Sequence, residues 1–514
     1  SGWRNALGVG GMYLVASAGA VTYWRATGAS PGAGDLALWL LLVPTALSLA
    51  GLGLWRRWSA SRARNAHAET VTRNVALPRD TATGPAASAA PLMRVLASAL
   101  WLPAGRDAFE VIDTLREQRR PRLHPTLRDL HGFPATVADI EGVDEAGADG
   151  AFGANDDETA QRRALALLRP VAEELLLAAL PPPATDWADA TFADAGPAMH
   201  PYAMHHSQSA RAPAAPQRAT LRIALMVPAP WLASTRVHAS TQLHDLASAL
   251  GHDGEHTDVQ CIPIEREADI WDWLAQQASA LREPTACGDR LLLLAADSSV
   301  SDWVIERWAT EDRLLRSAVT EGEVPGEGAA GLLLAAPDAQ TTHAGAKSSG
   351  HGGAATRCME RTDRTEGTDA TCVHLHPPLV AAVGQASRAR DAARIGGELI
   401  AGALHAADCN ATLPLQAITT ADHRPSRMTE AATALASECP DLDPVEDALH
   451  LGVSCGSLGV VAPVALLAVA AMQARATATP TLAYSLADAT TRAVVVMSPV
   501  VDEPHPPADA TSAA

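Results

Sequence analysis

One short segment has the residue types and the spacing of a metal site. Cys372, His374 and His376 form a Cys-x-His-x-His pattern, and alternation along a strand would place the three side chains on one face. Thiolate and imidazole are the groups that bind zinc, but a structural zinc ion needs a fourth ligand. The neighbouring sequence offers none, so the pattern favours a polar strand edge, and we expect neither a metal nor another cofactor.

A second grouping has the residue types of a hydrolase. Asp422, His423 and Ser426 lie close together in the sequence. A catalytic serine normally occupies a strained strand-to-helix turn such as Gly-x-Ser-x-Gly, whereas Ser426 follows a proline in a predicted loop. We expect Ser426 or Thr429 to cap a helix instead.

The cysteines predict free thiols. Their number is odd and their spacing forms no disulfide framework, which is typical of a reducing compartment. The seven residues are Cys261, Cys287, Cys358, Cys372, Cys409, Cys439 and Cys455.

Composition excludes some classes of function. The 514 residues carry a formal charge of -19, which repels phosphate backbones, so nucleic acid is not an expected partner. Hydrophobic residues make up 47% of the chain, enough for a large core. Lys347 is the only lysine.

Residues 1–58 have the pattern of a transmembrane helical hairpin. Leu7–Trp24 and Leu36–Trp55 are uncharged, and each is close to the roughly 20 apolar residues that cross a bilayer. Arginines flank the outer ends of the pair, whereas the connecting loop carries only Arg25 and Asp35. The positive-inside rule then places both termini and the soluble body in the cytoplasm, on a bacterial inner membrane. The alternative for the first run, a cleaved signal peptide, does not account for the second run.

The remaining chain divides into four parts. Residues 59–91 are rich in Ala, Thr, Ser, Arg and Pro and predict a flexible tether. Residues 92–330 and 331–501 each alternate strand and helix patterns, as an α/β protein does. Residues 502–514 predict a disordered tail.

Hydrophobic periodicity predicts the elements of both halves. Strands are expected at Met93–Leu102, Thr220–Val227, Arg290–Ala295, Gly331–Ala336, Thr371–His376, Leu415–Thr419, Thr481–Leu486 and Ala493–Ser498. Helices are expected at Asp107–Gln118, Arg162–Leu180, Ser240–Leu250, Asp269–Leu281, Arg388–Ala407, Thr429–Glu438 and Val460–Gln473.

Five collinear segments resemble the β-ketoacyl synthases of the thiolase fold. They are the opening Arg94–Ile140, the alanine-rich helix Arg162–Leu180, Asp289–Ala336 with DRLLLLAADSSV and VPGEGAAGLLLA, Asp422–Glu430 (DHRPSRMTE), and Ser454–Leu467 (SCGSLGVVAPVALL). The resemblance implies a thiolase-like duplicated α-β-α-β-α body after the transmembrane hairpin. It also implies a homodimer, or a heterodimer with a ketosynthase, formed through segments of Ser240–Leu294.

The resemblance also implies chemistry whose residues are altered. The family's nucleophilic cysteine, at a helix N-terminus that lowers its pKa, falls near Asp269. Its two histidines fall at Thr419 and at Gly456 or Ser457. The lysine before the second histidine is also missing. Substitutes could come only from His423 after a register shift, or from Cys261 or Cys455 in a residual acyltransferase.

These features predict a pseudo-enzyme. The first hypothesis is a membrane-anchored, ketosynthase-like scaffold or adapter on the cytoplasmic face of the inner membrane, in a secretion or envelope assembly. The alternative is a non-catalytic partner, similar to a chain length factor, of an active β-ketoacyl synthase in fatty-acid or polyketide synthesis.

Overall fold

The computed structural model describes most of the predicted α/β body. It covers Arg25 and residues 90–143, 156–180, 219–283, 286, 288–337, 372–384, 389–409 and 415–500. The chain divides into two compact units, and all these residues except Arg25 belong to the second, Pro85–Ala514. The two predicted spans, nearly all of the tether and the tail lie outside the described residues. Within the described ranges, no helix has the length and apolarity to span a membrane.

The first half contains a large sheet and one separate hairpin. Its elements are β1 (Met93–Trp101), α4 (Ala108–Arg116), β2 (Arg122–Arg128), β3 (Pro134–Val137), α5 (Asp156–Ala179), β4 (Leu221–Pro228), α6 (Ala233–Ala249), η3 (Gly254–His256), β5 (Thr257–Ile264), α7 (Glu267–Leu281), β6 (Arg290–Ser298), α8 (Asp302–Thr310) and β7 (Glu327–Ala335).

The second half follows the same plan. Its elements are β8 (Val373–Leu375), β9 (Leu379–Ala382), α9 (Ala389–Ala406), β10 (Gln416–Thr419), α10 (Pro425–Glu438), β11 (Ala448–His450), α11 (Leu451–Cys455), α12 (Val461–Thr477), β12 (Thr481–Ser485) and β13 (Thr491–Pro499).

The strand order shows that the two halves are a duplication. The first half runs β1-β7-β6-β4-β5 and the second runs β8-β13-β12-β10-β11. The senses of pairing also agree, because in each half the first two pairings of these orders are antiparallel and the last two are parallel. β1 and β8 pair antiparallel where the halves meet.

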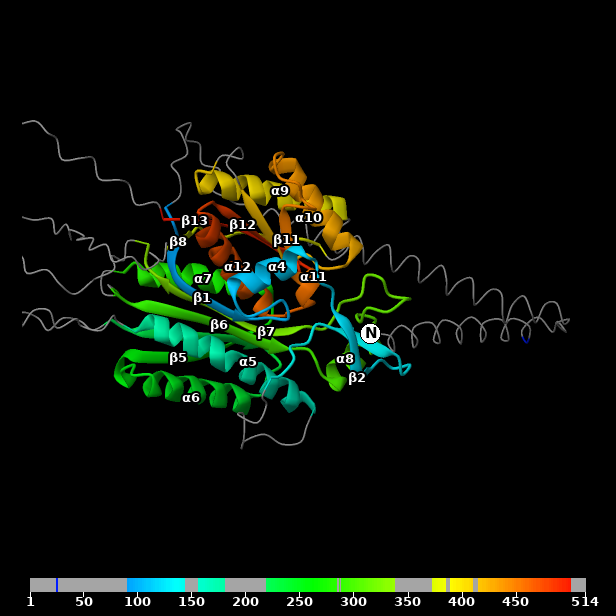
Figure 1. The fold of residues 1–514 in the computed structure, drawn as a ribbon, viewed down its shortest axis with the longest axis horizontal. Coiled ribbons are helices and arrows are strands. Elements are labelled where there is room, and N and C mark those ends of the chain that lie inside the picture. The colour runs from blue at the N-terminus through cyan, green and yellow to red at the C-terminus, as the bar shows by residue number, and fades with distance from the viewer. Residues whose placement is uncertain are drawn as a thin grey trace, which may run out of the picture. The chain divides into compact units, whose positions relative to one another are not determined.

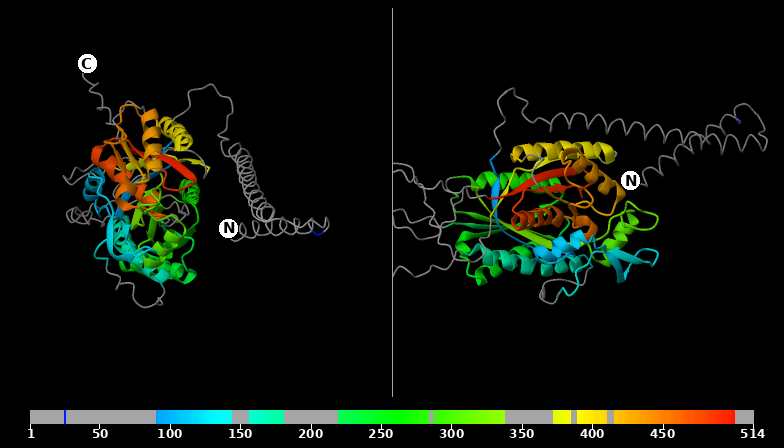
Figure 2. Two further views of the ribbon diagram at one scale, coloured as in Figure 1. Left: turned by 90° about the vertical axis from the view of Figure 1, so that its right-hand side faces the viewer. Right: turned by 45° about the horizontal axis from the view of Figure 1, so that its top comes forward.

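The described helices and strands form five layers. α5 and α6 cover the outer face of the first half-sheet, and α9 and α10 cover the outer face of the second. α7 and α12 lie between the two half-sheets, where they share one apolar core with strands of both halves (Figures 1 and 2). The mixed α/β, thiolase-like architecture expected from the sequence is therefore present in this part of the chain.

The central layer explains why the residues of α12 are apolar on every side. From Val461 to Ala471 each of its residues is buried, because the helix packs against β7 on one side and β12 on the other. A helix that is hydrophobic all round is stable only when it is enclosed in this way. The N-termini of α12 and of α7 both lie at the junction between the halves.

The observed elements differ from the expected ones in several places: hydrophobic periodicity does not predict α8, β9, β11 and α11, and α6 begins at Ala233 rather than at Ser240. β5 and the β2–β3 hairpin have no counterpart among the expected elements, because their sequences are polar and interrupted by Pro263 and Pro125. Helix α10 begins at Pro425 after an Arg424 N-cap. The expected capping by Ser426 or Thr429 is therefore wrong.

Candidate functional site

The N-terminus of α7 carries acidic side chains at the place predicted for the nucleophile. Asp269 lies in the first turn, where its Oδ2 accepts a hydrogen bond from the Arg266 backbone N–H at 3.0 Å and its Oδ1 contacts the Arg266 guanidinium at 2.7 Å. This capping arrangement satisfies free N–H groups of the helix end. Asp269 therefore stabilises the helix terminus.

Glu267, rather than Asp269, connects α7 with the second half. Its Oε1 accepts a hydrogen bond from Trp271 Nε1 at 3.1 Å, and its carboxyl also bonds to Ser485 at the end of β12. Burial raises the pKa of Glu267 to about 7, against the opposing effect of these hydrogen bonds. Glu267 was not among the candidate residues, because the helix expected from the sequence begins two positions later, at Asp269.

Thr419 occupies the first predicted histidine position and is fully buried. Its hydroxyl lies 2.8 Å from His450 Nδ1, and it accepts a hydrogen bond from the Ala421 backbone N–H. His450 Nε2 lies 3.3 Å from the Pro444 carbonyl, and burial lowers the pKa of His450. The structure thus brings the imidazole of His450 to Thr419, and His450 was not among the candidate site residues predicted from the sequence.

Gly456 and Ser457, at the second histidine position, contact a segment of the first half. Gly456 has a φ of +64° at the end of α11, and a Cβ there would collide with the Val324 carbonyl. The Ser457 hydroxyl donates to Glu323 Oε2 at 3.1 Å, and its backbone N–H donates to the Val324 carbonyl at 2.8 Å. The glycine therefore permits a close approach of backbones.

The segment Glu321–Gly326, which precedes β7, contacts two loops of the second half: the loop after β10 and the turn at Gly456 and Ser457. His423 Nε2 lies 3.0 Å from the Gly322 carbonyl, and Ser426 Oγ donates to Glu321. These contacts fix His423 and Ser426 at the interface with the segment, so the two side chains do not form the hydrolase-like grouping that their spacing allows.

An ionic cluster lies beside the same loops. Glu430 forms ion pairs with Arg492, which is 1% exposed, and with Arg427 at 3.1 Å. Arg424 pairs with Asp422 at 2.7 Å. Buried charges need such pairing, since an isolated charge away from water is costly. The cluster fixes the loop after β10 by charge pairing.

The two candidate thiols lie in environments that disfavour a thiolate. Burial raises the pKa of Cys261, on β5, to about 11. Burial also raises the pKa of Cys455, at the end of α11, to about 12. A thiol is nucleophilic as its anion, and a raised pKa keeps it protonated near pH 7. At Cys261 the charge of Arg236 opposes this increase in pKa, but burial outweighs it.

The Cys-x-His-x-His pattern lies at β8, where the two half-sheets join. His376 Nε2 lies 2.9 Å from Ser498 Oγ, and burial lowers the pKa of His376 to about 4. Among the described residues no group of three or more His, Cys, Asp or Glu is placed to hold a metal ion. The described contacts of His376 are with β13: its backbone N–H donates to the Val496 carbonyl, and its side chain contacts Ser498.

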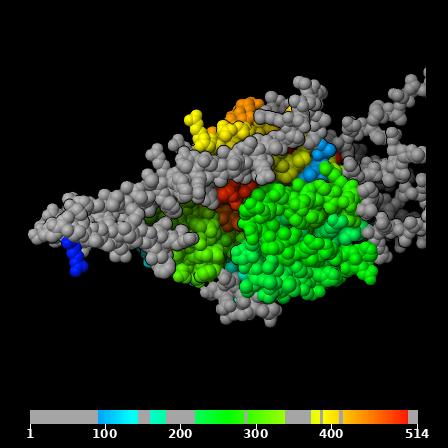
Figure 3. All heavy atoms as spheres, turned by 180° about the vertical axis from the view of Figure 1, so that it is seen from behind, coloured from blue at the N-terminus to red at the C-terminus, as the bar shows by residue number. Residues whose placement is uncertain are grey.

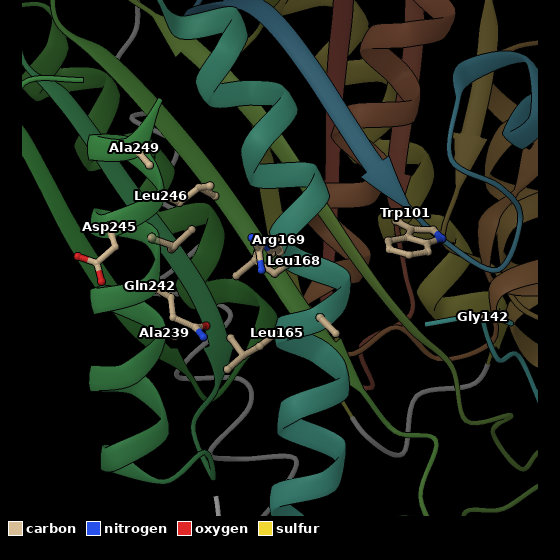
Figure 4. A pocket seen from close by; sticks show the side chains of 12 residues that line it. Trp101, Gly142, Leu165, Leu168, Arg169, Ala239, Gln242, Asp245, Leu246 and Ala249 are labelled. Atoms are coloured by element: carbon tan, nitrogen blue, oxygen red, sulfur yellow. The ribbon is translucent and has the colours of Figure 1, made fainter. Parts of the chain in front are cut away.

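A groove of about 540 Å³ lies between α5 and α6, apart from these positions. Its walls are mainly apolar, with Leu165 and Leu168 from α5 and Leu246 from α6. Arg169 lies between the two helices, whereas Asp245 points away from α5 (Figure 4). Asp269, Thr419, Gly456 and Ser457 are not among the residues that line the groove.

Comparisons with known proteins find similarity only among solved structures. No family model matches the sequence, and no curated protein is significantly similar to it. The ishigamide ketosynthase/chain length factor matches with a TM-score of 0.47 and 13% identity, over 80% of this chain and 99% of that one. A ketosynthase from module 6 of the bacillaene synthase from Bacillus subtilis 168 has a TM-score of 0.48 and 12% identity, over 80% and 72% of the two chains.

A third structure, AntDE:AntF, contains a type II PKS acyl-carrier protein in complex with its ketosynthase. It matches with a TM-score of 0.48 and 12% identity, over 80% of this chain and all of that one. Such low identity transfers no activity to this chain. The architecture assigned to this chain rests on its own duplicated strand order.

Proposed function

We propose that this protein is a non-catalytic partner subunit, similar to a chain length factor, of an active β-ketoacyl synthase. The observation that carries the proposal is the N-terminus of α7, where Glu267 and Asp269 stand in place of a nucleophilic thiol. A carboxylate cannot form the thioester intermediate on which ketosynthase chemistry depends. Thr419, Gly456 and Ser457 at the histidine positions support the same conclusion.

The partner would dock on the edge strand β5. Among the described strands β5 pairs only with β4, so its outer edge is unpaired. Asp258 and Gln260 are exposed on it, and the region from β4 to β6 belongs to the broad green face in Figure 3. An unpaired edge offers backbone donors and acceptors to a strand of another chain. Pairing there would extend the sheet into the synthase.

Co-expression with a β-ketoacyl synthase from the same genome tests this proposal. We expect a one-to-one complex by native mass spectrometry. Gln260→Lys should weaken it, because a lysine on an edge strand opposes strand pairing. Ser248→Lys, on the exposed side of α6, is the matched control and should leave the complex intact. A complex insensitive to Gln260→Lys would reject this interface, and failure to form any complex would reject the function.

The membrane-anchored adapter predicted from the sequence remains the rival. It rests on the apolar runs Leu7–Trp24 and Leu36–Trp55, which lie almost entirely outside the described residues. Recovery of the detergent-solubilised chain with secretion or envelope proteins, and without a synthase, would favour the adapter. A synthase partner recovered from the membrane fraction would support both the anchor and the partner role.

A further inference from the structure

The β2–β3 hairpin presents apolar side chains that the fold does not use. Leu123, Leu130 and Phe133 are 63%, 49% and 67% exposed, whereas Leu127 of the same hairpin is buried. The hairpin forms its own two-stranded sheet and projects beyond the main sheet beside α8 (Figures 1 and 2).

The hairpin is anchored to the body through its inner face and through its turn. Its inner face, with Leu127 and Val137, packs against Ile305 and Trp308 of α8 in a separate apolar core. At its turn, Asp129 Oδ1 accepts hydrogen bonds from the backbone N–H groups of residues 131 and 133, each at 2.9 Å. A preorganised turn loses little conformational entropy when it binds a surface.

The same segment is a basic region of an acidic protein. Residues 116–133 contain five arginines against Glu117 and Asp129 in a chain with a net charge of -19. Arg116, Arg119 and Arg122 pair with nearby carboxylates, so the positive charge that described carboxylates leave unpaired is that of Arg120 and Arg128. Arg120 and Arg128 are exposed, and neither forms an ion pair with a described carboxylate. The Arg128 guanidinium donates to the Pro125 carbonyl at 3.2 Å, but no described carboxylate neutralises it or Arg120. Arg122, in contrast, pairs with Asp139 at 3.0 Å and with Glu141.

We infer that this hairpin patch, made of Leu123, Leu130 and Phe133 with Arg120 and Arg128, docks on the surface of an anionic lipid bilayer. Apolar side chains on a projecting turn enter the boundary between headgroups and acyl chains, while guanidinium groups bind lipid phosphates. An acidic protein would satisfy the arginines, but it would need a groove for the apolar side chains. The projecting shape favours the bilayer.

The inference is independent of the proposed partner role and of the predicted transmembrane hairpin. It concerns a contact made by the folded body, which would fix how that body faces a membrane. A basic patch with few apolar residues binds weakly by itself and becomes effective beside a second attachment.

Hydrogen–deuterium exchange of the full chain tests the inference residue by residue. The protein is mixed with vesicles of phosphatidylcholine alone or with equimolar phosphatidylglycerol. We expect slower amide exchange in residues 119–134 with the anionic vesicles alone, and loss of this protection at high salt. The double variant Arg120→Gln/Arg128→Gln should weaken association by about fivefold for each arginine removed.

Leu130→Ser/Phe133→Ser should also remove the protection without unfolding the protein, because both side chains are exposed. The controls are Val237→Ser, at an exposed apolar position of α6, and Arg390→Gln on α9, which should both retain it. Equal protection on neutral vesicles, or protection that survives both hairpin variants, would overturn the inference. Protection by an acidic protein and not by anionic lipid would do so as well.

Discussion

At the scale of single residues, the altered positions have specific structural contacts. Asp269 caps α7, Thr419 bonds to His450, and Ser457 bonds to Glu323. Each side chain satisfies a neighbouring polar group, and the contact of Ser457 with Glu323 joins the two halves. The residues at the positions where the family carries its catalytic groups therefore make contacts that stabilise the fold.

Replacing Glu267 with glutamine (Glu267→Gln) should change how stability depends on pH. The folded pKa of Glu267 is about 7, above the usual 4.5 of a glutamate, so its contribution to stability is present below about pH 4.5 and is lost as the pH rises through 7. The glutamine side chain stays neutral throughout. The difference in urea midpoint, variant minus wild type, should therefore increase from pH 5 to pH 8, because only the wild type loses stability over this range. Glu174→Gln, at an exposed position, is the control and should show no such trend. A pH-independent difference would contradict the raised pKa.

Breaking the buried ion pair of Glu430 and Arg492 should destabilise the second half strongly. Arg492→Leu leaves a carboxylate of Glu430 buried with only Arg427 as a charged partner, so we expect a loss of about 3–5 kcal/mol in the free energy of unfolding. Arg492→Leu/Glu430→Leu should cost less than the sum of the single variants, because neither buried charge of that pair then remains. Additive losses in urea titrations would show that the pair is not coupled.

At the scale of elements, each of the central helices α7 and α12 begins beside a polar side chain of the opposite half. Glu267 at the N-terminus of α7 bonds to Ser485 of β12, and Asp297 of β6 accepts a hydrogen bond from the Val460 backbone at the N-terminus of α12. Burial raises the pKa of Asp297 to about 7. The duplication thus produces two related junctions between the halves.

Gly459→Ala should disrupt the junction at Asp297. Gly459 has a φ of +53°, and a Cβ there would collide with the Asp297 carboxylate. Backbone strain alone costs about 1–2 kcal/mol for a non-glycine residue in this conformation, and the collision adds to it. Gly132→Ala is the control, since its φ is +81° and its Cβ would meet open space. Equal losses of unfolding free energy in the two variants would mean that the contact with Asp297 contributes nothing.

The elements that sequence could predict are those with a clear hydrophobic pattern. The expected strands Thr220–Val227 and Arg290–Ala295 correspond to β4 and β6, because continuous aliphatic runs mark strands buried on both faces. Edge strand β5 was missed, since its alternation includes Asp258 and Gln260. In the candidate site, the placement of the family's catalytic positions at Asp269, Thr419, Gly456 and Ser457 stays a prediction from the resemblance. The contact of Thr419 with His450 could not be predicted from the sequence, because it depends on the parallel pairing of β10 and β11.

At the scale of the whole molecule, the proposed function describes a subunit that keeps the duplicated α/β frame and leaves the chemistry to its partner. Two surfaces remain available for partners among the described residues: the unpaired edge of β5 and the hairpin patch. The first would meet a synthase and the second a lipid bilayer. A protein with both contacts could hold an active synthase beside a membrane.

The central claim is that this chain pairs with a synthase and does not itself carry acyl groups. The most direct measurement incubates the co-purified complex with acyl thioesters and maps adducts on both chains by mass spectrometry. The account predicts acylation of one cysteine in the synthase and none in this chain, including Cys261 and Cys455. Stoichiometric acylation of a defined cysteine in this chain would contradict it.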